Sequence, residues 1–168
     1  MTRLLIWPIV VGALLCLCGC SVGQQNEFAI YLATQDVTTI EAMAIDIQHI
    51  TLEDEPVLTV DDIVSYSEEW HEIILIPRAY ERLQALKVPV TGRPFVVCVG
   101  NERIYAGAFW TPISSLLFDG VTIWQPLGGD NRLIRIEFGY PSAGYGTGED
   151  PRSDERIMDA LRRAGKLK

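Results

Sequence analysis

The clearest hydrophobic pattern in this chain is a pair of apolar runs that flank a two-residue turn. Residues 95–99 and 102–106 are rich in β-branched, aromatic and small apolar side chains, and Gly100 and Asn101 lie between them. Glycine and asparagine tolerate the positive φ angles that tight hairpin turns need. The pattern therefore predicts an antiparallel β-hairpin at this position.

Several other segments have the pattern of short strands. In residues 133–138, apolar side chains alternate with charged ones, which indicates one buried face and one face in water. Residues 27–33, 71–76 and 121–124 are apolar runs bounded by polar or turn-forming residues, and residues 55–59 predict a short extended segment. We therefore expect these segments to form strands of a sheet.

Two segments have the spacing of amphipathic helices. Pro77 suits the first turn of a helix over residues 78–86, because the first helical N–H groups have no partner within the helix. A closing helix follows Ser153 or Asp154, either of which can cap it. Residues 38–45 fit a short helix or part of a strand equally well.

Strands interspersed with two main helices indicate an α+β domain with an antiparallel or mixed sheet. The chain has 168 residues, a length that suits one domain. We expect this domain to span residues 27–168, with a glycine- and tyrosine-containing loop at residues 140–151.

The first twenty residues have the pattern of a secretory signal. Arg3 precedes an apolar run from Leu4 to Leu17, and a small residue, Gly19, precedes Cys20. The sequence Leu17-Cys18-Gly19-Cys20 resembles a bacterial lipobox. An uncleaved membrane anchor and ordinary secretion are the alternatives, but the apolar run is shorter than the roughly 20 residues that a spanning helix needs.

The lipobox resemblance implies a processed and lipidated protein. Residues 1–19 would be the signal peptide, Cys20 would carry a diacylglycerol, and residues 20–26 would form a lipidated tether. The partner implied is the lipid bilayer, which the acyl chains on Cys20 would enter. The expected location is the cell membrane, with the domain on the extracytoplasmic side.

The net charge and the cysteine content limit the kinds of partner and the thiol chemistry that we expect. The formal net charge is −8, and loss of the leader makes it more negative, so a nucleic-acid partner is not expected. Cys98 is the single cysteine in the expected domain at residues 27–168, which leaves it no disulfide partner within that domain. Its strand-like surroundings indicate a buried, unreactive thiol.

The middle of the chain resembles a known family. Residues 52–125 are similar to the head subdomain of the large periplasmic domain of the protein-export membrane protein SecD. The likeness rests on residues 55–59, 61–63, 73–75, 77, 80–83, 92–97, 100–106 and 120–123. It implies a small ferredoxin-like α+β sandwich, and the whole chain also resembles small uncharacterised bacterial lipoproteins.

Aromatic residues provide the best candidates for a binding surface. Trp110 follows Phe109 at the end of the predicted hairpin, and side chains of successive strand residues point to opposite faces. We expect Phe109 in the core, while Trp110 fits either the core or the surface. Trp110, Tyr140 and Tyr145 form the candidate binding surface.

Catalytic and metal-binding patterns are weak. Ser114 or Ser115 with His71 and Asp119 could form a hydrolase triad, but no Gly-x-Ser-x-Gly elbow is present. His49 and His71 lack the close spacing or cysteine partners typical of zinc sites. Two acidic clusters, around Pro56 and at residues 149–155, lack the calcium-loop pattern. We therefore expect no enzyme activity, metal or cofactor.

These patterns lead to one main functional hypothesis and two alternatives. The main hypothesis is a lipid-anchored, extracytoplasmic, non-enzymatic interaction module. Its expected role is that of an accessory in envelope assembly or protein export, and its expected partner is an envelope protein. It predicts an exposed apolar patch. The first alternative is a lipoprotein that binds a small ligand in an aromatic-lined cavity, and the second is a serine hydrolase.

Overall fold

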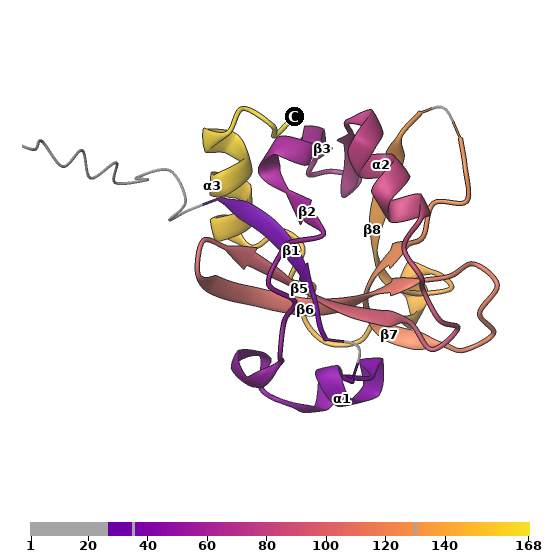
Figure 1. The fold of residues 1–168 in the computed structure, drawn as a ribbon. Helices are drawn as coiled ribbons and strands as arrows, with labels where there is room; N and C mark the ends of the chain where they lie inside the picture. The colour runs from indigo at the N-terminus through magenta and orange to yellow at the C-terminus, as the bar shows by residue number, and fades with distance from the viewer. Residues whose placement is uncertain (1–26, 35, 130) are drawn as a thin grey trace, which may run out of the picture.

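A single eight-stranded sheet organises the domain (Figure 1). The computed structural model describes residues 27–34, 36–129 and 131–168. The strands are β1 (Phe28–Leu32), β2 (Leu58–Thr59), β3 (Ile63–Ser67), β4 (Glu72–Leu75), β5 (Arg93–Val99), β6 (Glu102–Trp110), β7 (Phe118–Trp124) and β8 (Leu133–Tyr140). The helices are α1 (Thr39–Ala44), α2 (Pro77–Gln84) and α3 (Glu155–Arg163), with 3₁₀ turns η2 (Ile47–His49), η3 (Val60–Asp62) and η4 (Ala143–Tyr145).

The spatial order of the strands is β2-β1-β5-β6-β7-β8-β4-β3. The predicted hairpin is confirmed as β5 and β6, with Gly100 at φ +59° in the turn. β6 extends to Trp110, beyond the predicted end, and pairs in parallel with β7. All other neighbouring strands are antiparallel.

The parallel pairing of β6 with β7 depends on a small residue at Gly107. A Cβ atom there would lie 2.6 Å from the backbone oxygen of Val121 and 2.6 Å from the Phe95 ring. Glycine therefore allows the two strands and the Phe95 side chain to approach closely at the centre of the sheet.

Local sequence signals, a proline or a capping side chain, mark where the helices begin. The first residue of α2 is Pro77, as predicted, and Asp154 caps α3 by accepting a hydrogen bond from the backbone N–H of Arg156 at 2.9 Å. Residues 38–45, for which the sequence left two options, contain the helix α1. Thr38 and Glu41 form a capping box at its start.

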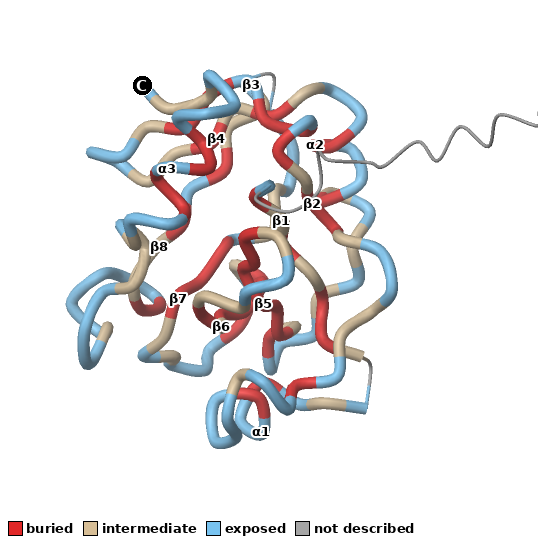
Figure 2. Tube along the Cα trace, turned by 90° about the vertical axis from the view of Figure 1, so that its left-hand side faces the viewer, coloured by how far each residue is buried: buried red, intermediate tan, exposed pale blue. Residues whose placement is uncertain are grey.

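The main core fills the concave face of the curled sheet. Alternate β5 residues Phe95 and Val97 point into it, together with Leu83 of α2 and Leu161 of α3. Figure 1 shows α2 and α3 on one side of β5 and β6, with α1 on the other. In Figure 2, the buried positions concentrate along the central strands.

A second, smaller core lies on the opposite face of β5. Val96 and Cys98 pack there against Ala42 of α1 and against Ile50. Cys98 is buried and has no disulfide, and desolvation by burial raises the pKa of its thiol. The prediction of a buried small side chain at this position is confirmed.

The structure confirms a single α+β domain with a mixed sheet. The two expected helices, α2 and α3, are both present, and a third, shorter helix, α1, precedes them in the chain. Residues 52–125 do not form a contiguous sheet, because β1 lies between β2 and β5, and β8 lies between β7 and β4.

The proposed signal peptide, Cys20 and the tether lie outside the described residues. Within the described part of the chain, no helix is long and apolar enough to span a membrane.

Candidate functional site: an apolar groove over an aromatic cluster

Four aromatic side chains from β6, β7 and β8 pack against one another, two from the opposite ends of β7 and one each from the last residues of β6 and β8. The rings of Trp110 and Phe118 are stacked with centroids 5.0 Å apart, and the Trp110 and Tyr140 centroids are 5.6 Å apart. Trp124 extends the group, since its ring centroid is 5.4 Å from that of Tyr140. We call Trp110, Phe118, Trp124 and Tyr140 the aromatic cluster.

The structure brings two of the three predicted binding residues together, but in the interior. Trp110 and Tyr140 are only 3% and 5% exposed, whereas Tyr145 is 45% exposed. Phe109 is buried in the main core, as expected, so Trp110 points to the opposite face of the sheet. Of the three, Tyr145 is therefore the one with a broadly exposed side chain, and the other two support the surface from beneath.

Hydrogen bonds hold the loop at residues 111–117 over the aromatic cluster. The Tyr140 hydroxyl donates to the backbone carbonyl of Ser114 at 3.0 Å. The Ser114 hydroxyl donates to the backbone carbonyl of Val90 at 2.6 Å and accepts from the Leu116 N–H at 3.2 Å. The loop is thus attached to two distant parts of the fold, which fixes the position of the apolar residues that follow it.

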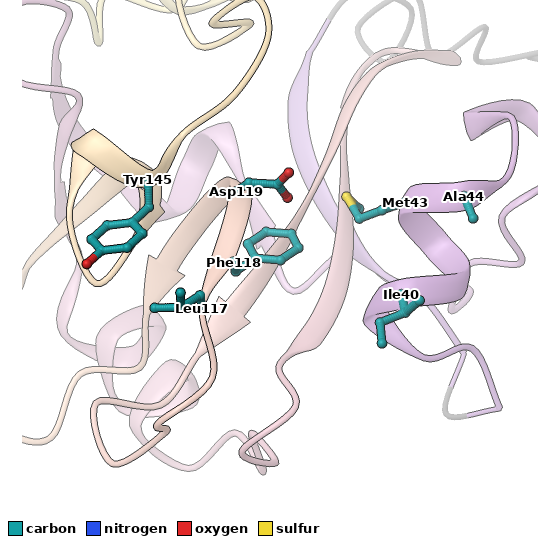
Figure 3. A pocket seen from close by; sticks show the side chains of 7 residues that line it. All are labelled: Ile40, Met43, Ala44, Leu117, Phe118, Asp119 and Tyr145. Atoms are coloured by element: carbon teal, nitrogen blue, oxygen red, sulfur yellow. The ribbon is translucent and has the colours of Figure 1, made fainter.

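An apolar groove lies between α1 and the segment that leads into β7. Figure 3 shows that α1 forms one wall, the start of β7 forms the floor and Tyr145 lies at the other side. The groove has a volume of about 530 Å³. Its lining consists of Ile40, Met43, Ala44, Leu117, Phe118, Asp119 and Tyr145.

Large apolar side chains in this groove are open to solvent. Ile40 is 83% exposed and Leu117 is 65% exposed. Asp119 is the single charged side chain in the lining, and it accepts a hydrogen bond from the Thr147 hydroxyl at 3.0 Å. Contiguous exposed apolar surface of this kind is typical of sites that bind another molecule.

A separate polar cluster lies between β3, β4 and the segment before α3. The Tyr66 hydroxyl lies 3.0 Å from Nδ1 of His71, and Arg152 donates to the backbone carbonyl of Ile136 at 2.7 Å. Burial, with a further contribution from the charge of Arg152, lowers the pKa of His71. Burial also raises the pKa of Tyr66 above its ordinary value. Both side chains are therefore held in their neutral forms near neutral pH.

The residues proposed for a serine hydrolase have other partners. Ser114 is part of the loop hydrogen bonds described above, and His71 pairs with Tyr66. Among the described residues, no hydrogen bond joins Ser114 or Ser115 to a histidine. The same part of the chain contains no group of three or more histidine, cysteine or acidic side chains placed to hold a metal ion.

Local sequence patterns do not predict most of the groove. Ile40 and Met43 have three-residue spacing, which places them on one face of α1, but the sequence of residues 38–45 fits a helix or a strand equally well. Leu116 and Leu117 are consecutive apolar residues after a polar turn, which is the remaining local signal. Only the tertiary structure brings Ile40 and Met43 of α1 close to Leu117, which precedes β7.

Comparisons with known proteins found no match to this chain. No protein-family model, no curated protein and no solved structure matches the chain. The geometry of the described residues and the sequence patterns are therefore the basis for the functional proposal.

Proposed function

We propose that this protein is a lipid-anchored, extracytoplasmic interaction module without enzyme activity of its own. Its proposed role is that of an accessory in envelope assembly or protein export. The observation that carries the proposal is the groove between α1 and the start of β7, in which Ile40 and Leu117 are exposed.

The chemistry of the groove favours an apolar partner segment. Burying exposed apolar side chains removes them from water and contributes roughly 25 cal/mol for each Å² covered. Hydrogen bonds hold the loop on one side of the groove, and a capping box stabilises α1 on the other. Preformed walls lower the ordering cost of binding. We infer that the partner is an apolar segment of an envelope protein.

Membrane anchoring is supported by the leader and by the charge of the chain. The lipobox-like sequence places the proposed lipid on Cys20, a few residues before β1 begins at Phe28. Anionic headgroups repel an acidic chain, so the acyl chains would supply the attachment. The domain would then stay close to the membrane, where partners in the envelope are concentrated.

The proposal retains the resemblance to SecD for individual helices and strands. Residues 52–125 contain α2 and the β5–β6 hairpin, which occur in the order that the resemblance implies. We propose that these elements derive from a ferredoxin-like arrangement that β1 and β8 have extended.

The proposal is tested first by comparing the wild type with Cys20→Ser in a bacterium that processes lipoproteins. We expect the wild type to fractionate with membranes, with an intact mass that begins at Cys20 and includes acyl groups. The Cys20→Ser variant should lose the acyl mass and the membrane association. A wild-type product that is unprocessed and unacylated would contradict the anchoring proposal.

The groove is tested in the same cells with a photo-crosslinking amino acid at Leu117. We expect one discrete envelope protein to be crosslinked, and Ile40→Glu should abolish the product because it places a charge in the apolar wall. A crosslinker at the exposed Glu81 of α2 is the matched control. Equal products from both positions, or a product unaffected by Ile40→Glu, would contradict docking in the groove.

A further inference from the structure

A second pocket lies at the C-terminal end of β7, where the chain turns towards β8. Its volume is about 480 Å³, which lies within the range of known ligand sites. Trp124, the last residue of β7, contributes to its lining together with Arg135 and Glu137 of β8. Among the described residues, it shares none with the lining of the groove. The pocket is therefore a separate site on the domain.

Hydrogen bonds fix the loop that borders this pocket. The Gln125 side chain donates to the backbone carbonyl of Leu86 at 2.6 Å, and the Tyr80 hydroxyl donates to that of Gly128 at 3.0 Å. These bonds attach the loop between β7 and β8 to α2 and to the turn that follows α2. A wall that is ordered before binding lowers the entropy cost of binding.

The Trp124 side chain provides a partly exposed aromatic surface in the pocket. Its ring packs against that of Tyr140, with the centroids 5.4 Å apart, while the residue remains 39% exposed. Leu127, another lining residue, is 71% exposed. A large aromatic ring that is held on one side and open to solvent on the other gains binding energy when a flat apolar surface covers it.

The register of the sheet places two charged side chains on the same face as Trp124. Ile123 and Ile136 are paired across β7 and β8, and both belong to the main core. The next residue of β7, Trp124, and the preceding residue of β8, Arg135, therefore point away from that core. Glu137 lies two residues from Arg135 along β8, on the same face, and its carboxylate is 3.6 Å from Nη1 of Arg135.

The pair formed by Arg135 and Glu137 presents hydrogen-bond donors and acceptors side by side. Nε of Arg135 donates to a carboxylate oxygen of Glu72 at 3.1 Å, and Nη2 donates to the same oxygen. These contacts hold the guanidinium in place and leave further N–H groups, since arginine has five. A carboxylate accepts several hydrogen bonds. Neighbouring hydroxyl groups of a ligand can therefore accept from Arg135 and donate to Glu137.

An exposed indole beside such a pair matches the two sides of a pyranose ring. The C–H bonds on one face of the sugar form a flat apolar surface, and equatorial hydroxyl groups project from its rim. Arg135 is the one cation among the described lining residues, and its two carboxylate partners disfavour an anionic ligand. A proline-rich peptide also offers flat rings, but its prolines have no backbone N–H to donate to Glu137.

We propose that the pocket at the end of β7 binds an uncharged saccharide through a pyranose ring with equatorial hydroxyl groups. The apolar face of the ring stacks on Trp124, and neighbouring hydroxyl groups bond to Arg135 and Glu137. This site is independent of the proposed docking of a protein segment in the groove.

The test uses three probes with the full chain in lipid nanodiscs. Cellotetraose is uncharged and has equatorial hydroxyl groups, a β-1,4-linked tetramer of glucuronate has a carboxylate on each ring, and an octaproline peptide has flat rings without hydroxyl groups. The readout is saturation-transfer difference NMR on each probe, followed over a titration. We expect saturable transfer to the ring C–H protons of cellotetraose, and about tenfold weaker binding or none for the other two probes.

Trp124→Ala tests the aromatic surface. We expect it to weaken cellotetraose binding about threefold to tenfold, whereas Trp124→Phe should retain part of the affinity because a flat ring remains. Trp70→Ala is the matched control at a tryptophan that is 61% exposed and lies outside the pocket lining, and it should leave the affinity unchanged. Circular dichroism and thermal unfolding verify that each variant is folded.

Glu137→Gln tests the hydrogen-bonding pair with little change in shape. We expect it to weaken cellotetraose binding about threefold, because the amide accepts fewer hydrogen bonds than the carboxylate. It should strengthen binding of the glucuronate tetramer, because a repelling negative charge is removed. A purely structural role of Glu137 would weaken the binding of both saccharides alike.

Four results would overturn the proposal. They are the absence of saturable transfer to cellotetraose, glucuronate binding as tight as that of cellotetraose, tighter binding of octaproline, and equal affinities of Trp124→Ala and Trp70→Ala for cellotetraose. A failed crosslink at Leu117 would affect only the docking proposal, because the groove and this pocket have no described lining residue in common.

Discussion

At the scale of single residues, the polar cluster around His71 shows how tertiary contacts change the burial and the pKa of a side chain. The sequence predicts that His71 begins a strand at residues 71–76. In the structure, His71 has a φ of +48° and its ring is half-buried, with Nδ1 facing the Tyr66 hydroxyl. Asp150 lies near both groups and forms an ion pair with Arg152, whose hydrogen bond lowers the pKa of Asp150.

The depressed pKa of His71 makes stability depend on pH. The pKa of the folded protein lies below the ordinary value of 6.5, so the unfolded chain takes up the proton first as the pH falls. This contribution to folding is fully present above pH 6.5 and is lost progressively as the pH falls below 6.5 towards the folded-state pKa. Protonation would also place a cation near Arg152 and turn Nδ1 into a donor towards Tyr66.

We predict that His71→Asn reduces the loss of unfolding free energy between about pH 7 and pH 5. Asparagine tolerates the positive φ, so the backbone strain changes little. Urea denaturation at several pH values measures the effect. His49→Asn at an exposed histidine is the control and should keep the wild-type pH dependence. Parallel profiles for the wild type and His71→Asn would contradict the prediction.

At the scale of secondary-structure elements, local capping decides where α1 and α3 begin. Asp154 precedes α3 and accepts a hydrogen bond from the backbone N–H of Arg156. Asp154 also forms an ion pair with the Arg156 side chain at 2.7 Å. The hydrogen bond to the backbone satisfies a group that the first turn of the helix leaves unpaired, whereas the ion pair is partly exposed and contributes less.

We predict that Asp154→Ala lowers the free energy of unfolding by about 1 kcal/mol, because it removes the cap of α3. Asp154→Asn should retain most of the stability, since asparagine also caps helices well. Chemical denaturation measures both variants, with Glu149→Ala as a control for the loss of one acidic group. If the asparagine and alanine variants lose the same free energy of unfolding, the effect comes from the ion pair with Arg156 and not from the cap.

At the scale of the whole molecule, the C-terminal residues cover one edge of the sheet. The edge strand β3 pairs through Tyr66, whose N–H donates to the carbonyl of Lys166 and whose carbonyl accepts from the N–H of Lys168, both at 2.8 Å. Leu167 packs against the main core between these two bonds. The chain thereby protects an edge that would otherwise offer unpaired backbone groups to another molecule.

We predict that deletion of residues 166–168 destabilises the domain and promotes association between copies. The deletion removes two backbone hydrogen bonds and exposes core positions next to Leu167. Urea denaturation and analytical ultracentrifugation provide the measurements. The double variant Lys166→Ala/Lys168→Ala, which keeps the backbone, should behave as the wild type, and a deletion variant that does so too would contradict the prediction.

Local sequence patterns determined much of the secondary structure. The Gly100-Asn101 turn predicts the hairpin, the alternation in residues 133–138 predicts β8, and Pro77 and Asp154 mark the starts of two helices. These features depend on φ preferences, capping and alternation, which act between residues close in the chain. The same local reasoning predicted the burial of Phe109 and Cys98.

Only the tertiary structure decided how these elements combine. The parallel pairing of β6 with β7 and the position of β8 beside β4 join segments far apart in the sequence. Burial of Trp110 and Tyr140 depends on a loop attached to Val90 and on neighbouring α1, which no local pattern specifies. The candidate site arises where these distant segments meet, because packing between them decides which apolar side chains remain exposed.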